Sequence, residues 1–120
     1  MQDIIRAIIK DPGEKAREKT MINSLKELQY EVGGLFKVLR LGCIGGILMI
    51  INKERNLKEL GLNFPLGNGF IVGTAVFVGE EAGEESGDLR GLTEAEIQIV
   101  HRIIEGDERY KDLDSLVDGK

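Results

Sequence analysis

The sequence predicts a single small α+β domain, with a mostly antiparallel sheet of four to five strands and two short helices. Three observations support this class. A length of 120 residues suits one domain. Short apolar runs alternate with turn residues, which is typical of strands. Two other segments have apolar residues at helical spacing behind capping residues. We assign residues 1–106 to the domain and 107–120 to an acidic C-terminal tail.

The strands are expected in the following order. Residues 4–9 form an apolar strand that ends at an Asp-Pro-Gly turn, and the charged residues 14–20 form an exposed return strand. Residues 35–41, 47–52 and 70–78 form three further strands, whereas 57–66 is irregular and the glycine-rich, acidic 79–91 is a loop.

The two helices are marked by their ends. Ser24 and Glu27 have capping-box spacing, and a Gly-Gly pair follows, so the first helix spans 24–32. Thr93 and Glu96 have the same spacing, and the second helix runs from there to Gly106. Apolar residues recur at helical spacing in the tail, which is either a docked helical turn or frayed.

The runs at 47–51 and 70–78 are apolar at both strand parities, the pattern of strands buried on both faces. Two short helices cover about one sheet face, so the tail, the 57–66 segment or another subunit must cover the second. We therefore expect a homodimer or larger homo-oligomer.

Charge and composition narrow the classes of function. The net charge is −5, with a net +3 over residues 1–78 and a net −8 over 79–120. With no basic cluster, direct nucleic-acid binding is disfavoured. A single cysteine forms no intrachain disulfide, and no secretory leader or membrane-length apolar run is present, so we expect a cytoplasmic protein without a membrane partner.

Residues that could carry chemistry are few. His101 is the only histidine, and nothing near it has nucleophile spacing, so we interpret it as a partly buried structural residue. Cys43 is interpreted as a small packed side chain. Paired glutamates at 80–81 and 84–85 would hold a divalent cation only weakly. The glycines at 67, 69 and 73 lead into a strand, which is wrong for a phosphate loop. We expect no catalytic residues, no metal and no cofactor.

Several short motifs recur in a known order. They are a Pro-Gly strand end at 12–13, LQ-x-x-VGG at 28–34, LGLN at 60–63, I-x-GT-x-x-x-VG at 71–79 and an L-T-x-x-E helix start at 92. Over about residues 4–104 the chain resembles an uncharacterised family, a domain of unknown function encoded by bacteriophages and mobile elements of Gram-positive bacteria. The resemblance implies a mobile-element setting, in which small non-enzymatic proteins often disarm host defences. The chain departs from the family pattern in having Leu35-Phe36 after the double glycine and Phe64 after Asn63.

These observations favour a binding protein over an enzyme. Our leading hypothesis is a counter-defence protein in the host bacterial cytoplasm that sequesters a small anionic, nucleotide-derived signal. Arginine pairs bidentately with phosphate, and asparagine reads a base edge or ribose. The candidate ligand-binding residues are the polar side chains near strand ends: Arg40, Asn52, Arg55, Asn63, Asn68 and Thr74. For each asparagine the alternative is that it only satisfies a turn backbone. The alternative function is a protein inhibitor or DNA mimic that docks on a host defence protein through the acidic segment 79–120. A third possibility is a hydrolase that uses His101 or the loop glutamates.

Overall fold

The computed structural model describes residues 4–41, 46–54, 60–66, 69–80, 89–106 and 117–118 of the chain. The elements in these ranges are β1 (Ile4–Lys10), β2 (Arg17–Ile22), α1 (Leu25–Val32), β3 (Phe36–Arg40), β4 (Ile47–Asn52), β5 (Leu62–Leu66), β6 (Gly69–Val72), β7 (Ala75–Glu80), β8 (Leu89–Arg90), α3 (Glu94–Ile104) and β9 (Val117–Asp118).

The main sheet has the strand order β2-β1-β7-β4-β3-β9, and β8 pairs with β7. All of its described pairings are antiparallel. A separate antiparallel hairpin is formed by β5 and β6. The predicted α+β class, a mostly antiparallel sheet with two helices, is therefore confirmed, although the described sheets contain more strands than the four to five expected.

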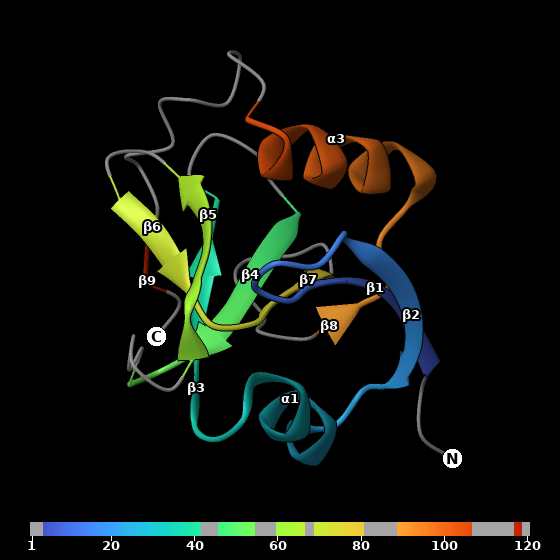
Figure 1. Cartoon of the computed structure of the whole chain (residues 1–120). Helices are drawn as coiled ribbons and strands as arrows, with labels where there is room; N and C mark the ends of the chain where they lie inside the picture. Colours follow the sequence, from blue (N-terminus) through green and yellow to red (C-terminus); the bar gives the residue numbers. More distant parts are fainter. Residues whose placement is uncertain are drawn as a thin grey trace.

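The two helices lie on opposite faces of the main sheet (Figure 1). On one face, Leu28 and Val32 of α1 pack with Ile50 and Val76 of the central strands. On the other face, α3 and the β5–β6 hairpin bury their apolar side chains against Met49 and its neighbours. Every residue of β4 is consequently buried. The burial of apolar surface by these two layers stabilises the fold by about 25 cal/mol for each Å² removed from water.

This arrangement corrects one premise of the sequence argument. The prediction that 47–51 and 70–78 are buried on both faces is confirmed for 47–51 in β4 and for 75–78 in β7, but it is wrong for the part in β6, where Phe70 is 57% exposed. The expectation that the two helices cover a single face is wrong, because each covers one face and the hairpin shares the second with α3. The chain therefore covers its own central strands. The homo-oligomer stays a prediction, but this burial pattern no longer argues for it.

The strand expected over 70–78 is broken in two at Gly73-Thr74. Gly73 has φ +80, a conformation that L residues rarely adopt, and its N–H donates to the Gly61 carbonyl oxygen at 2.8 Å. The chain turns there and leaves the hairpin for the main sheet. The expectation that 57–66 is irregular is wrong for Leu62–Leu66, which form β5, whereas 55–59 lie outside the described residues.

Both predicted helix starts are confirmed. The Ser24 hydroxyl accepts a hydrogen bond from the Glu27 N–H at the start of α1, and Gly33 ends that helix in the left-handed conformation. Thr93 and Glu96 form the full capping box of α3, in which each side chain accepts from the other residue's N–H.

The remaining segments differ in outcome. The charged return strand expected at 14–20 is β2, displaced to Arg17–Ile22. The expected loop at 79–91 includes the end of β7 and all of β8, and residues 81–88 lie outside the described part. The tail at 107–120 was expected to be a docked helical turn or frayed, but its described residues, Val117–Asp118, form β9 and pair with β3. The rest of the tail, 107–116 and 119–120, lies outside the described part. Within the described ranges, no helix has the length and apolar character needed to cross a membrane.

Candidate functional site

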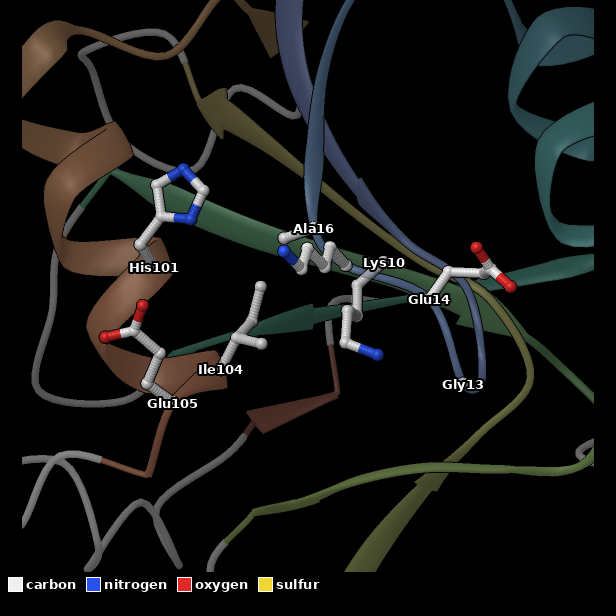
Figure 2. A pocket seen from close by; sticks show the side chains of 8 residues that line it. Lys10, Gly13, Glu14, Ala16, His101, Ile104 and Glu105 are labelled. Atoms are coloured by element: carbon white, nitrogen blue, oxygen red, sulfur yellow. The ribbon is translucent and has the colours of Figure 1, made fainter.

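A pocket of about 620 Å³ lies between the turn that joins β1 to β2 and the C-terminal end of α3. In Figure 2, Lys10 and Ala16 lie across this space from His101 and Ile104, whereas the Glu14 carboxylate points away from α3. The volume lies within the range of about 300–1,000 Å³ that is usual for small-molecule sites. We call this space the β1–β2/α3 pocket.

The helix periodicity places one wall of this pocket. Ile97, Val100 and Ile103 are buried toward the sheet. His101 and Glu105, four residues apart, share the adjacent helix face, which is directed at the β1–β2 turn. His101 is half-buried there, and its side chain makes no hydrogen bond or ion pair with another residue in the described part of the chain.

The opposite wall comes from the turn after β1. The Glu14 N–H donates to the Asp11 carbonyl oxygen at 3.1 Å, and Gly13 takes φ +77, so the chain reverses within four residues. This reversal places Lys10 before the turn and Lys15 after it on the same pocket. Ala16 completes the wall as an apolar residue packed against the core below α3.

The charges in the pocket are of both signs. The Lys10 ammonium donates to two neutral oxygens, Asn63 Oδ1 at 2.9 Å and the Asp11 carbonyl at 3.0 Å. Lys15 has no side-chain partner among the residues that the structure describes, and the same holds for the carboxylates of Glu14 and Glu105. Two ammonium groups therefore remain available to an anion, and two carboxylates remain available to a hydrogen-bond donor.

Two of the predicted ligand-binding residues lie directly behind Lys10. Asn63 Nδ2 donates to the Lys10 carbonyl oxygen at 2.6 Å and to the Gly73 carbonyl oxygen at 2.8 Å. Thr74 Oγ1 donates to Asp11 Oδ1 at 2.5 Å. Both side chains bond to residues of the β1–β2/α3 pocket or its turn, so the structure brings Asn63 and Thr74 together at this corner.

The other predicted residues are not gathered there. Arg40 lies at the opposite end of the β3–β4 pair from Asn52, since Arg40 pairs with Leu48 and Asn52 with Phe36. Arg40 forms two hydrogen bonds with Glu80, at 2.8 and 3.2 Å.

Asn52 is 6% exposed and donates to the Val32 carbonyl oxygen at the end of α1. Its Oδ1 accepts from the Glu54 N–H, so it satisfies backbone groups at a turn. Arg55 and Asn68 lie outside the described residues. The strand-end asparagines and arginines thus do not form one cluster in the described part of the chain.

The residues that line the pocket were absent from the set predicted to bind ligand. The available signal was weak: Lys10 and Lys15 flank the Pro-Gly turn, and His101 borders the apolar stripe of α3. Lys10 and His101 are 91 positions apart, so their proximity depends on where α3 crosses the sheet. The spacing of residues in the sequence does not indicate where α3 crosses the sheet.

Part of the negative charge of the acidic segment 79–120 is paired with arginines of the same chain. Glu96 forms two hydrogen bonds to Arg90, at 2.7 and 2.8 Å, and these lower the pKa of the Glu96 carboxyl. Glu80 pairs with Arg40. Within the described ranges, no three histidine, cysteine or acidic side chains are grouped so that they could hold a metal ion.

Comparisons with known proteins give a family and no activity. No curated protein and no solved structure matches this chain. Residues 5–105 match a family model described as Domain of unknown function (DUF3846), almost the range over which the motifs resembled an uncharacterised family. The chain therefore belongs to the DUF3846 family.

Proposed function

We propose that the protein is a non-enzymatic binding protein that holds a small anionic molecule in the β1–β2/α3 pocket. The observation that carries this proposal is that Lys10 and Lys15 line one pocket, and the described part of the chain pairs neither ammonium with a carboxylate. Five other cations in the described ranges pair with carboxylates, namely Arg6, Arg17, Lys19, Arg40 and Arg90. Hydrogen bonds from an ammonium to an anionic oxygen are shorter and stronger than neutral ones.

The carboxylates indicate what else the ligand carries. Glu14 and Glu105 accept hydrogen bonds and repel additional negative charge. A ligand that suits all four groups has one anionic end together with hydroxyl or amino donors. Ala16 and Ile104 add an apolar surface against the core. A nucleotide-derived molecule has all three features: a phosphate, ribose hydroxyls or an exocyclic amine, and a planar base.

The geometry favours holding a ligand over transforming it. His101 is the group in this pocket best suited to general acid–base chemistry, but it has no hydrogen-bond partner in the described part of the chain that would orient its ring. A catalytic histidine is normally fixed by a second side chain or carbonyl oxygen. We assign His101 to ligand contact, where its imidazole can donate to a phosphate oxygen.

The biological setting is part of the proposal. Motif resemblance suggests bacteriophages and mobile elements of Gram-positive bacteria, where a small sequestering protein would act in the host cytoplasm. Removing a nucleotide-derived signal would prevent a host defence from being activated. A protein that acts in this way needs a tight pocket and no catalytic machinery.

The test is a thermal-shift and calorimetric screen against linear and cyclic nucleotides. The proposal predicts that at least one member raises the melting temperature and binds at a one-to-one ratio per chain. Lys15→Ala and His101→Ala should each weaken binding of that compound at least about tenfold, since a charged hydrogen bond contributes roughly 1.5–3 kcal/mol and about 1.4 kcal/mol is a factor of ten.

Lys26→Ala is the matched control, because Lys26 is an exposed lysine on α1, which packs on the opposite face of the sheet. It removes the same charge from the chain and should leave affinity unchanged. If no nucleotide binds, or if Lys26→Ala weakens binding as much as Lys15→Ala, the pocket is not the site.

A further inference from the structure

We propose that Asn63 is a positioning residue that holds the Lys10 ammonium ready for the anion without neutralising its charge. This inference rests on the proposed function, since it concerns how the same pocket recognises its ligand. Asn63 lines no part of the pocket itself and acts through Lys10.

The hydrogen bonds of Asn63 define one geometry for Lys10. The amide oxygen accepts from Lys10 Nζ at 2.9 Å, while the amide nitrogen donates to the Lys10 carbonyl oxygen at 2.6 Å. The second amide hydrogen goes to the Gly73 carbonyl oxygen at 2.8 Å, which anchors the side chain at the bend between β6 and β7. From the β5–β6 hairpin, Asn63 therefore forms hydrogen bonds with both the backbone carbonyl and the ammonium group of Lys10.

Two of the three N–H groups of the Lys10 ammonium have acceptors among the described residues. An ammonium carries three N–H groups, of which one points to Asn63 Oδ1 and one to the Asp11 carbonyl oxygen. In the described part of the chain the third N–H has no acceptor, and the Lys10 side chain lines the pocket. An anionic oxygen that enters the pocket can accept a hydrogen bond from this N–H without displacing either existing bond.

The neutrality of the two acceptors matters as much as their position. A carboxylate in the place of Asn63 would also hold Lys10, but it would cancel the charge that attracts the anion and would repel the ligand. An amide oxygen orients the ammonium and leaves its full positive charge. Lys10 is also ordered before binding, so the ligand does not have to immobilise a long flexible side chain.

A purely structural role is the competing explanation, because Asn63 also ties β5 to β1. The two roles differ in what an Asp substitution does. If Asn63 only ties strands, Asn63→Ala and Asn63→Asp change affinity only to the extent that they loosen the fold. If it positions an uncharged acceptor, Asn63→Asp weakens anion binding beyond its effect on stability.

The experiment titrates the full-length protein with inorganic pyrophosphate and follows binding by NMR and calorimetry. The expected losses of affinity are about three- to tenfold for Asn63→Ala, from the lost ordering of one long side chain, and more than tenfold for Asn63→Asp. Asn23→Ala is the matched control. It also removes an asparagine that bridges two elements, through its bond to the Leu89 carbonyl oxygen at 3.1 Å, and it should change affinity less than twofold.

A second measurement needs no variant. In the unliganded wild-type protein, the Lys10 Cε methylene should have a clearly higher NMR order parameter than that of Lys15, which has no described partner. Equal mobility of the two lysines would overturn the positioning role. So would unchanged pyrophosphate affinity in Asn63→Ala, or Asn63→Asp binding no more weakly than Asn63→Ala. Failure of the wild-type protein to bind pyrophosphate or any nucleotide would instead overturn the proposed function, and the positioning role with it.

Discussion

The β5–β6 hairpin covers part of one sheet face, and two phenylalanines of this hairpin allow that packing to be measured. Phe64 is 3% exposed, and its ring lies 6.2 Å from that of the fully buried Phe77, centroid to centroid. Phe70, on the facing strand of the same hairpin, is 57% exposed. Phe64→Ala and Phe70→Ala therefore remove the same atoms from one hairpin at opposite extremes of burial.

The magnitudes follow from these environments. A buried Phe→Ala substitution costs about 3–5 kcal/mol through lost transfer energy and the cavity left behind. A half-exposed phenylalanine loses roughly 1 kcal/mol or less, since most surface substitutions have small effects. With a urea m-value of about 1.5–2 kcal/mol/M, Phe64→Ala should lower the unfolding midpoint by about 2 M and Phe70→Ala by roughly 0.5 M or less.

Equilibrium urea unfolding, followed by circular dichroism, measures both variants. The comparison is valid if the m-values agree, because a changed m-value would mean that the unfolded or native state differs. Equal losses of stability in the two variants would refute the reasoning. They would mean that the inner face of the hairpin is not packed on the sheet as described.

Three further predictions concern single contacts. Asn52→Ala should destabilise the protein by about 1–3 kcal/mol in thermal unfolding, because it leaves buried backbone groups without their partner; a loss below 0.5 kcal/mol would contradict this. The Arg90 guanidinium holds the pKa of the Glu96 carboxyl below its ordinary value. The Arg90–Glu96 pair therefore contributes fully to stability at a pH above the ordinary pKa of Glu96, and this contribution is lost as the pH falls through the lower pKa of the folded state. Glu96→Gln should therefore make the free energy of unfolding less dependent on pH in the acidic range, and an unchanged profile would count against the pair. Gly73→Ala should cost about 1 kcal/mol or more by urea unfolding, because φ is +80 and the new methyl group would lie 3.2 Å from Leu60 Cβ; a neutral result would argue against the bend.

Local signals predicted the local structure well. The Thr93–Glu96 capping box and the Gly33 cap were both predicted, because each depends on residues within one helical turn. The buried strand β4 was predicted with its observed bounds, because a short unbroken apolar run is typical of a strand that is buried on both faces.

Non-local arrangements were not predictable in the same way. The strand pattern continues through Gly73, and only the observed turn shows that the chain changes sheets there. The two helices lie on opposite faces because of where each one crosses the sheet, and the hydrophobic periodicity of a helix does not indicate this position. The first error came from an apolar pattern that runs without a break across two strands, and the second from deciding packing by the number of helices.

The candidate site was predicted only in part. The emphasis on strand-end polar residues selected Asn63 and Thr74, which do lie beside the β1–β2/α3 pocket. It missed Lys10 and Lys15, because lysines beside a turn are usually solvated, and it assigned His101 to the core border. The pocket depends on the meeting of a hairpin turn and a helix end that lie far apart in the sequence.

The most direct test of the account is to identify the small molecules that co-purify with the protein from the cells that produce it. The wild-type chain and a Lys10→Ala/Lys15→Ala double variant would be purified in parallel under native conditions, denatured, and analysed by mass spectrometry. We predict a nucleotide-derived anion that is enriched with the wild-type protein and lost from the double variant. The same compounds in equal amounts from both proteins, or no anionic compound from the wild-type protein, would contradict the claim that this pocket sequesters such a ligand.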